Sequence, residues 1–494
     1  MNGLFKAFAS TIGITLIVVA SSLSSSTFAQ PQPGPTPCFD CSETSTEYPN
    51  CESASRDEQS AEQKVRDQVL KGSRKRLDEG SVIRGCFVRD LLTKGPGVSE
   101  MGIVIDGATI KGPIDIRNQA VNVHVELINC KFQDDFNMKR SHFSKGLSLA
   151  GSVFGGLGSD PPNGRLDAEG AKIDFDFILD DTRFLSCPPY FKSISVGVDL
   201  SVRRAKFVGH VDFTGALIGS NFFAGKEDRD DPRQTEFGGG ADFEGTKVGL
   251  NADLNDVRFG CTTMFGSAEF NILSIDRTNF DGDVNFKSTK IGDFYSGDHP
   301  ADRFKGNLMI EDLTFQYMSP EDLEQLRSFA AKSNASKEQS KHNAQFYATL
   351  ETILRKHGHD DWGDEVYIAG KQKEREYLPW YWKAWGLFLD WFIGYGRHVG
   401  RLLWWSLIFI ALGCGMFWCK NWMERKEPEK TAEYTKRYNP FLYSLDLFLP
   451  IIGLGYADNW TPKTPWGRIY KPFHIIVGHL FVPIGLAAWT GLIK

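Results

Sequence analysis

The chain has 494 residues, of which 41% are hydrophobic and 24% are charged, and its formal net charge is −6. This length exceeds what one hydrophobic core supports, so we expect two or three domains. The net charge gives no argument for a nucleic-acid partner. The unusual counts are 49 Gly and 37 Phe. Together they suit short strands and tight turns around a narrow core, because Gly permits positive φ and Phe fills a large volume.

The first 29 residues have the features of an export signal. Lys6 is their only charged residue, an apolar run from Ile12 to Ala20 follows it, and Thr27-Phe28-Ala29 offers small residues for cleavage. An uncleaved N-terminal anchor is the alternative. Both interpretations place residues from 30 onward outside the cytoplasm.

Residues 30–84 predict a Pro- and Ser-rich linker followed by a charged helix over 57–79 that covers the first repeat. Four cysteines in or just after this segment are candidates for disulfide bonds, because exported proteins fold in an oxidising compartment. They are Cys38, Cys41, Cys51 and Cys86. The spacing of the first two also resembles half of a zinc site, but the compartment favours disulfides, so we expect no metal.

Residues 85–317 carry a short repeat. Apolar landmarks recur every eleven residues, for example at Ile110, Val121 and Phe132, with short alternations such as Val284-Asn-Phe286 between them. Such a period indicates one unit stacked on itself, so that neighbouring units bury a continuous core. Two units make a coil of 21 or 22 residues. The sequence therefore predicts an all-β solenoid of about ten coils that resembles the quadrilateral pentapeptide-repeat β-helix.

Two segments interrupt this period, 187–193 and 225–239, and we expect them to project as loops. Acidic residues also recur along the repeat. Those in its middle part are Asp167, Asp174, Asp176, Asp180 and Asp181. They could form a calcium-binding or polyanionic surface, but outward carboxylates that keep a β-protein soluble are the preferred interpretation.

Residues 318–400 predict a helical neck. One helix begins near Ser319, carries an apolar stripe through Phe346 and Leu350, and ends near Gly358. A second helix runs from Asp364 to Tyr377, and an amphipathic juxtamembrane segment follows. Two histidines and two aspartates over 357–361 could bind a metal, but a histidine at a helix end is more often a cap.

Residues 401–494 predict a helical membrane domain. The uncharged runs 402–419 and 473–493 are long enough to span a bilayer, whereas 440–456 is apolar but interrupted, which indicates a broken or re-entrant segment. Cationic residues gather in 420–437, and the positive-inside rule puts that loop in the cytoplasm. The solenoid then lies in the periplasm or another extracytoplasmic space.

Three ionisable residues lie in these apolar segments: Asp446, His474 and His479. Ionisable side chains are costly inside a bilayer, so these three are candidates for a functional role. Alternatively, they lie at the interface or satisfy one another through an Asp–His hydrogen bond.

Gly453, Gly455, Tyr456 and Asp458 form a segment that looks like a potassium-channel filter. Filter carbonyls replace the water of an ion, and glycines permit the backbone that this needs. Ala457 stands where such filters have a second glycine, and the cytoplasmic 420–437 loop would bring the segment in from the opposite side. We therefore rank a channel-like role second.

Five sequence blocks in a fixed order resemble a family of bacterial pentapeptide-repeat-like membrane proteins. The blocks are GATIKGPIDI, DEVYIAGKQKERE, IGYGRHVGR, NPFLYSLDLFLPIIGLG with the following DNWTP, and AAWTGLIK. The resemblance covers the chain from about residue 80 and implies an inner-membrane protein. Members are often named membrane-associated oxidoreductases, yet this sequence has no haem-attachment motif, dinucleotide fingerprint or cluster spacing, so we expect no cofactor.

Three hypotheses follow. The first is a membrane-anchored, non-catalytic β-helix that presents a binding or scaffold surface to a protein or polysaccharide. Such a protein could form a homo-oligomer. The second is a channel-like or transport-coupled sensor that uses residues 440–458. The third is the oxidoreductase that the family name implies. No catalytic residue stands out for any of them.

Overall fold

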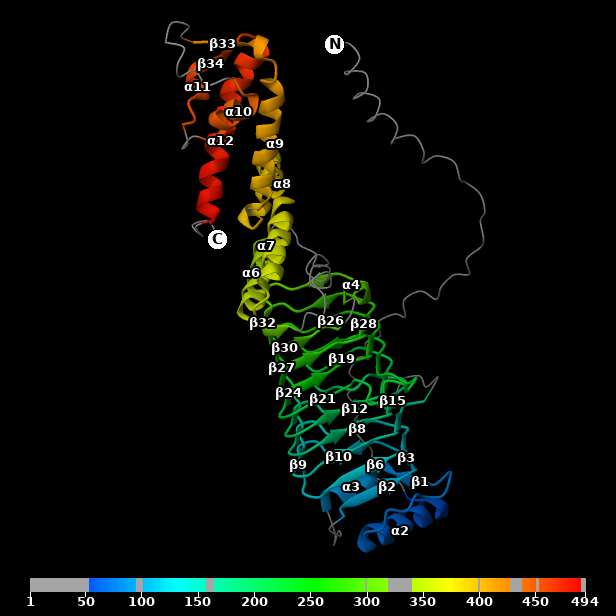
Figure 1. The fold of residues 1–494 in the computed structure, drawn as a ribbon. Helices are drawn as coiled ribbons and strands as arrows, with labels where there is room; N and C mark the ends of the chain where they lie inside the picture. Colours follow the sequence, from blue (N-terminus) through cyan, green and yellow to red (C-terminus); the bar gives the residue numbers. More distant parts are fainter. Residues whose placement is uncertain are drawn as a thin grey trace, which may run out of the picture. The chain divides into compact units, whose positions relative to one another are not determined.

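The structure is a computed structural model that describes residues 53–94, 101–156, 164–297, 300–318, 340–398, 400–426, 438–449 and 453–489. Residues 103–318 form a parallel β-solenoid of about nine turns, and the C-terminal region is helical (Figure 1). The predicted solenoid with C-terminal helices is confirmed at this level, with about one turn fewer than expected. The export signal and Cys38, Cys41 and Cys51 lie outside the described residues.

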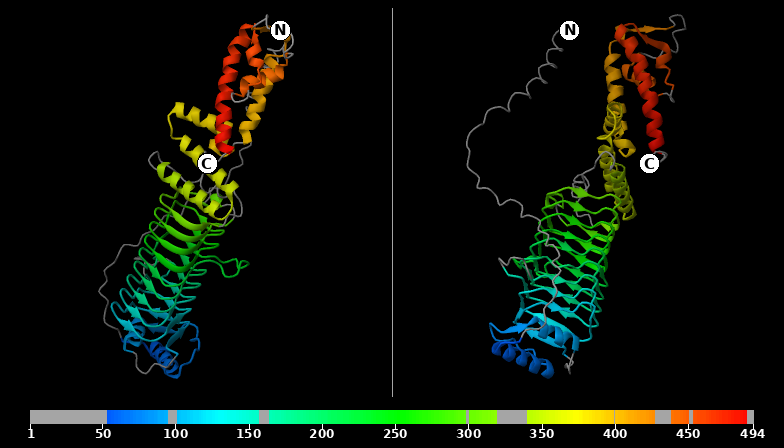
Figure 2. Two further views of the ribbon diagram at one scale, coloured as in Figure 1. Left: turned by 60° about the vertical axis from the view of Figure 1, so that its left-hand side comes forward. Right: turned by 180° about the vertical axis from the view of Figure 1, so that it is seen from behind.

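The strands stack turn upon turn in parallel ladders, as the views in Figure 2 show. One ladder contains β1 (Val82–Arg84), β3 (Thr109–Lys111), β7 (Lys131–Phe132), β11 (Val153–Phe154), β15 (Arg183–Phe184), β18 (Lys206–Phe207), β22 (Glu236–Phe237), β25 (Arg258–Phe259) and β28 (Asn279–Phe280). A 3-stranded ladder contains β4 (Ile114–Asp115), β8 (Phe136–Asn137) and β12 (Leu166–Asp167). A 5-stranded ladder contains β19 (Val211–Asp212), β23 (Ala241–Asp242), β26 (Thr263–Met264), β29 (Val284–Asn285) and β31 (Leu308–Met309).

The 15-stranded sheet has two arms that merge. One arm contains β2 (Ile103–Asp106), β6 (Val125–Ile128), β10 (Leu147–Ser148), β14 (Phe177–Ile178), β17 (Leu200–Ser201) and β21 (Phe222–Phe223). The other contains β5 (Ala120–Val121), β9 (His142–Phe143), β13 (Lys172–Ile173), β16 (Ser195–Val196) and β20 (Leu217–Ile218). The arms join in β24 (Lys247–Asp253), β27 (Glu269–Ser274), β30 (Lys290–Tyr295) and β32 (Thr314–Met318).

Stacked phenylalanines fill the interior of the solenoid. Phe132 pairs with Ile110 and with Phe154 in the strand register, as the 22-residue interval predicts. The rings of Phe132 and Phe154 have centroids 4.3 Å apart, and those of Phe237 and Phe259 are 4.9 Å apart. Parallel offset rings are a favourable aromatic geometry, and each ring removes a large apolar area from water. This ladder explains the high phenylalanine count.

The two predicted loops are only partly loops. Residues 187–193 do not project, because Tyr190 bridges Asp167 and Asp212 in the adjacent turns and Phe191 is fully buried. In the second segment, the chain returns to the solenoid at Thr235, which is buried, and Glu236 begins β22. The prediction of projecting loops is therefore wrong for 187–193 and too long for 225–239. A buried aromatic within each interruption keeps the interior filled.

Helices cover the first turn of the solenoid. Helix α2 (Arg56–Lys71) begins with a capping box between Ser55 and Glu58 and contacts β1 and β2. It is shorter than the expected 57–79 helix because Gly72 ends it in the left-handed conformation. Helix α3 (Gly85–Lys94) contacts β1, β4 and β5. Short helix α4 (Pro300–Arg303) lies late in the repeat.

The neck contains helices α6 (Ser340–Lys356), α7 (Asp360–Arg375) and α8 (Trp380–Ile393), followed by the 3₁₀ turn η1 (Gly394–Gly396). Helices α6 and α7 pack on each other, and the predicted stripe through Phe346 and Leu350 is buried. The expected start of the first helix near Ser319 lies outside the described residues. Phe346 also lies against Phe315 of β32, with ring centroids 5.8 Å apart.

The last part contains α9 (Gly400–Met416), η2 (Lys420–Trp422), β33 (Met423–Arg425), α10 (Pro440–Phe448), α11 (Tyr456–Asn459), β34 (Trp460–Pro462) and α12 (Pro465–Trp489). Of the described helices, one segment, Pro465–Ala487, is long and apolar enough to cross a membrane. A second span arises only if the bent pair Trp380–Gly396 and Gly400–Met416 counts as one. The expectation of two clean spans, 402–419 and 473–493, therefore has support for one helix, because α9 ends after 17 residues.

Candidate functional site

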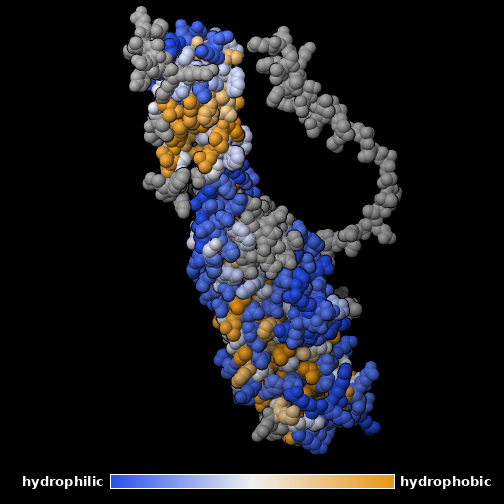
Figure 3. All heavy atoms as spheres, viewed as in Figure 1, coloured by the Kyte–Doolittle hydropathy of each residue, from blue (hydrophilic) through white to orange (hydrophobic). Residues whose placement is uncertain are grey.

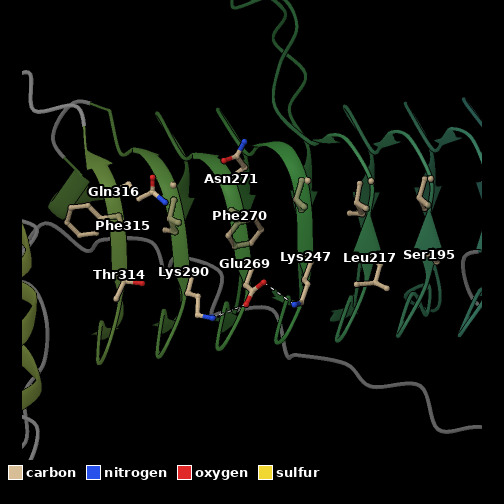
Figure 4. A pocket seen from close by; sticks show the side chains of 18 residues that line it. Ser195, Leu217, Lys247, Glu269, Phe270, Asn271, Lys290, Thr314, Phe315 and Gln316 are labelled. Atoms are coloured by element: carbon tan, nitrogen blue, oxygen red, sulfur yellow. Dashed lines mark hydrogen bonds and ion pairs between the residues drawn. The ribbon is translucent and has the colours of Figure 1, made fainter. Parts of the chain in front are cut away.

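A groove crosses six successive strands of the solenoid, β16, β20, β24, β27, β30 and β32 (Figure 4). It is a hollow of about 770 Å³. Its floor is backbone that covers inward-facing side chains such as Ile218 and Phe270, which are 4% and 5% exposed. One row of outward side chains borders it along the stack. These are Ser195, Leu217, Lys247, Glu269, Lys290 and Thr314.

Along the border opposite this row, glycines at four of the six turns leave the backbone free of side chains. A Cβ atom on Gly219 would lie 2.1 Å from the carbonyl oxygen of Gly197, and one on Gly249 would lie 2.1 Å from that of Gly219. At these glycines the backbones of adjacent turns approach so closely that a side chain would force them apart, whereas Asn271 and Gln316 hold the equivalent positions of two other turns. Gly292 repeats the relationship against Asn271, at 2.3 Å. The result is a strip of bare backbone that a partner can approach closely.

A chain of charges runs along the border of this strip. The ammonium groups of Lys247 and Lys290 each lie 3.0 Å from the Glu269 carboxylate, one from each adjacent turn. Their hydrogen bonds lower the pKa of the Glu269 carboxyl. All three side chains are well exposed, so these pairs contribute little to stability. They remain available to exchange partners with charged or hydroxyl groups of a ligand.

The groove suits an extended ligand. Its six strands are separated by five steps of about 4.8 Å, so it is about 24 Å long. Leu217 is 49% exposed on the charged border, and Asn271 and Gln316 line the other border, so the groove offers charged, apolar and hydrogen-bonding contacts. A linear chain could extend across the turns and contact a different pair of border residues at each one.

Asp446 lies at the end of a different network. Its two carboxylate oxygens accept hydrogen bonds from the backbone N–H groups of Leu454, Tyr456 and Ala457, at 2.6 to 2.7 Å. A carboxylate facing the N-terminus of α11 is favourably placed, because the first N–H groups of a helix lack partners within it. Asp446 therefore holds the 453–459 segment in shape, and no Asp–His hydrogen bond joins it to either histidine among the described contacts.

The same network bears on the filter-like residues Gly453, Gly455, Tyr456 and Asp458. The carbonyl of Gly455 accepts from the Asn459 side chain at 2.7 Å, and that of Ala457 accepts from Lys426 at 3.1 Å. A filter needs such carbonyls to face an ion. Here the carbonyls of Gly455 and Ala457 accept hydrogen bonds from other residues of the chain, and N–H groups of the segment donate to Asp446. An ion filter would need the carbonyls to be directed at the ion instead.

His474 is fully buried between α9, α10 and α12. Its ring contacts the hydroxyl and the carbonyl oxygen of Ser444, each at 3.1 Å, and Tyr470 at 3.3 Å. Hydrogen bonds thus satisfy the buried His474 ring, but its partners are Ser444 and Tyr470, and the alternative of an Asp–His hydrogen bond does not describe it. His479 contacts only the carbonyl oxygen of Ile475 within its own helix, at 2.8 Å, among the described residues.

Cys86 is disulfide-bonded, and so is Cys261, which the sequence interpretation did not select. Their partners lie outside the described residues. Cys130, Cys187, Cys414 and Cys419 form no disulfide bond. Burial raises the pKa of the Cys130 thiol to about 12, so this thiol is inert.

The acidic residues of the solenoid mostly organise turns. Asp167, for example, accepts a hydrogen bond from the Glu169 backbone at 3.1 Å, and Asp181 pairs with Arg204 at 2.7 Å. Within the described ranges, no group of three or more His, Cys, Asp or Glu residues could hold a metal ion. His357 and His359 are no exception, because His357 contacts the carbonyl of Ile353.

The groove was not predicted from the sequence. The signal that could have found it is the recurrence of glycine at 197, 219 and 249, one residue after an inward apolar position each time. Comparison with protein-family models, curated proteins and solved structures finds no match to this chain.

Proposed function

We propose that this protein is a membrane-anchored β-solenoid that presents its groove, outside the cytoplasm, to an extended protein or polysaccharide partner. The groove over six turns is the observation that carries this proposal. Its bare strip and its row of evenly spaced border residues fit a linear chain better than a compact small molecule. Pockets for small molecules usually enclose the ligand on most sides, and this groove is open. The proposal assigns no catalysis and no cofactor.

Membrane anchoring rests on the C-terminal helices. Helix α12 has the length and hydropathy of a span, and large apolar side chains of α9 and α12 are exposed, including Leu407, Ile408, Ile476 and Leu480. Figure 3 shows apolar surface gathered over this part of the chain. A water-soluble surface seldom exposes so large an apolar patch. In the proposal α9, although short, crosses with α12 in a bacterial inner membrane.

The extracytoplasmic location draws support from the disulfide bonds of Cys86 and Cys261. Disulfides persist in oxidising compartments and are rare in the cytosol. This agrees with the expected export signal over residues 1–29. Tyr190 connects the 3- and 5-stranded ladders, so together with the 9-stranded ladder and the two arms the solenoid has four faces of short parallel strands. These four faces support the finer proposals that the solenoid is of the quadrilateral pentapeptide-repeat type and that the chain belongs to the family it resembles.

A channel-like role is the second candidate, and the geometry of residues 453–459 weighs against it. The segment directs N–H groups to Asp446, and at Gly455 and Ala457 the carbonyls already have partners. A sensor that conducts ions would require these bonds to break.

Binding by the full chain in nanodiscs tests the proposal. Co-sedimentation with insoluble cell-wall polysaccharide examines one ligand class, and an array of unstructured peptides examines the other. Asn271→Trp should fill the strip and weaken binding at least tenfold, about 1.4 kcal/mol. Lys131→Trp places the same side chain on another exposed position of the solenoid and should have no effect.

Equal binding by the two variants, or no binding to either ligand class, would overturn the groove as the site. Reporter fusions after residues 60, 380 and 430 test the location independently. We expect extracytoplasmic signals at the first two and a cytoplasmic signal at the third.

A further inference from the structure

Helix α8 exposes an aromatic surface that nothing in the described chain covers. Half of its 14 residues are large apolar side chains at least 41% exposed to solvent. They are Trp380, Tyr381, Trp382, Trp385, Leu387, Phe388 and Trp391. The one buried residue is Gly386. So much exposed aromatic area on one short helix is unusual for a surface that faces only water.

One narrow side of α8 is polar and already occupied. The Asp390 carboxylate accepts hydrogen bonds from Arg375 at 3.0 Å and from Gln372 at 2.9 Å, both in α7. Arg375 also bonds the Tyr395 hydroxyl at 2.9 Å. This seam attaches α8 to the neck. At the end of the helix, Trp391 and Phe392 pack against Trp405 of α9, with ring centroids 4.6 and 4.8 Å apart. The remaining circumference, with Lys383 as its only charge, faces outward.

The composition of this surface differs from that of the neighbouring helices. The middle of α9 and α12 exposes aliphatic side chains, such as Leu407 and Leu480, whereas Trp404 and Trp466 lie near the helix starts. Bilayers sort side chains in this way, because the hydrocarbon core accepts aliphatic groups and the headgroup boundary favours the amphipathic rings of Trp and Tyr. By this criterion α8 has the composition of the boundary along its whole length.

We infer that α8 lies in the interfacial plane of the bilayer, with its tryptophans at the headgroup boundary and its Asp390 seam toward the neck. This inference rests on the proposed membrane anchoring. A bend separates α8 from α9, so the two do not continue as one straight span. A helix rich in Trp and with few charges binds the boundary through apolar area more than through anionic lipid. The neck is then fixed at the membrane surface.

Quenching of tryptophan fluorescence by brominated lipids tests this arrangement. The full chain is placed in phosphatidylcholine nanodiscs brominated either next to the headgroup or near the chain end. A first variant changes Trp380, Trp382, Trp385 and Trp391 to Phe. The matched control changes Trp404, Trp418, Trp422 and Trp466 to Phe. The difference between wild type and the first variant isolates the α8 indoles, and Phe keeps an aromatic ring at each position.

We expect bromine near the headgroup to quench the α8 signal more strongly than bromine near the chain end. Stronger quenching by the deep bromine would place α8 inside the core and overturn the inference. So would an α8 signal that only aqueous acrylamide reaches, or one that no quencher reaches, since a second protein copy would then cover it. If the control tryptophans also escape both lipids, the membrane anchoring fails as well. If they are quenched, only the position of α8 fails.

Discussion

The guanidinium group of Arg397 lies 2.7 Å from the carboxylate of Glu351, and both side chains are only 16% exposed. Arg397 follows η1, whereas Glu351 belongs to α6, so the bond joins the segment before α9 to the neck. Asp364 of α7 lies 3.6 Å from the same guanidinium, and the ring of Tyr367 lies 4.3 Å below it. One arginine thus connects α6 and α7 to the chain that precedes α9.

Replacement of Arg397 by Ala should lower the stability of the neck by about 2 to 3 kcal/mol, because two poorly exposed carboxylates lose a partner. Arg397→Lys should restore only part of this, since an ammonium group lacks the planar fork. Thermal unfolding in nanodiscs, with limited proteolysis of the neck, measures the effect. Arg401→Ala serves as the control, because Arg401 donates only a 3.3 Å bond to the Asp390 carbonyl. Equal melting temperatures for the two Ala variants would contradict the prediction.

Two glycines of α9 make a matched pair. A Cβ atom on Gly413 would lie 2.3 Å from the Ser444 hydroxyl and 2.8 Å from the His474 ring, whereas one on Gly415 would have nothing within 4 Å. Small residues allow helices to approach closely. Gly413→Ala should therefore destabilise the helical bundle by about 1 to 3 kcal/mol, the usual cost of overpacking. Gly415→Ala should be neutral or slightly stabilising, because alanine is the better helix former. Thermal unfolding in the same nanodiscs compares them, and a larger loss for Gly415→Ala would refute the packing argument.

Three consecutive turns of one ladder place Asp115, Asn137 and Asp167 in register. Burial raises the pKa of the Asp167 carboxyl above its ordinary value. Burial acts on Asp115 too, but hydrogen bonds from the Arg117 side chain and backbone outweigh it and lower the pKa. Asn137 makes the same turn, accepting from the Lys139 backbone at 3.1 Å, so asparagine fits all three positions.

These opposite shifts predict opposite pH dependence. The raised pKa of Asp167 means that its contribution to stability is complete below the ordinary carboxyl pKa and is lost as the pH rises through the folded value. Asp167→Asn should therefore stabilise the protein at neutral pH and cease to do so in acid. The lowered pKa of Asp115 means that its contribution to stability is present above the ordinary carboxyl pKa. This contribution is lost as the pH falls through the pKa in the folded protein. Asp115→Asn should destabilise at neutral pH and lose its effect in acid. Denaturant unfolding at several pH values measures both, and the same sign for the two variants would be incompatible with this account.

Peptide mapping without reduction should find Cys86 and Cys261 linked to peptides that contain Cys38, Cys41 or Cys51. Seven ladder steps separate β1 from β25, so the two cysteines lie about 34 Å apart and cannot bond to each other. Four of the other cysteines form no disulfide bond, which leaves Cys38, Cys41 and Cys51 as the available partners. Cys130 should resist alkylation until the protein unfolds, which gives an internal control. A direct link between Cys86 and Cys261, or free thiols at both, would contradict the assignment and weaken the extracytoplasmic proposal.

The repeat could be predicted from the sequence because one physical constraint acts at every turn. Inward positions such as Phe132 and Phe154 must be apolar and must recur at the length of one turn, so their interval reports the fold directly. The interruptions were harder. The pairing of Tyr190 with neighbouring turns depends on the conformation of residues 187–193, and no local signal distinguishes a filled turn from a projecting loop.

The functional residues were less predictable, because their roles depend on three-dimensional partners. Asp446 was selected for its cost in an apolar segment, yet its role follows from three N–H groups eight to eleven residues later. His474 was selected for the same reason, and its partner Ser444 lies thirty residues away. The groove requires Gly197 and Gly219 to lie above each other, which the sequence shows only once the turn length is known.

The helices over the first turn prevent the solenoid from growing by strand pairing with other molecules. A stack of parallel strands ends in unpaired N–H and C=O groups, and such an edge invites a strand from another molecule and growth into fibrils. Here α2 and α3 contact β1, β2, β4 and β5, the outermost strand of each ladder at that end. At the opposite end α6 contacts β32. These contacts cover the first turn and the last strand of the groove, so the length of the solenoid is encoded in the chain and does not grow by assembly. The solenoid therefore presents the same number of turns to every partner.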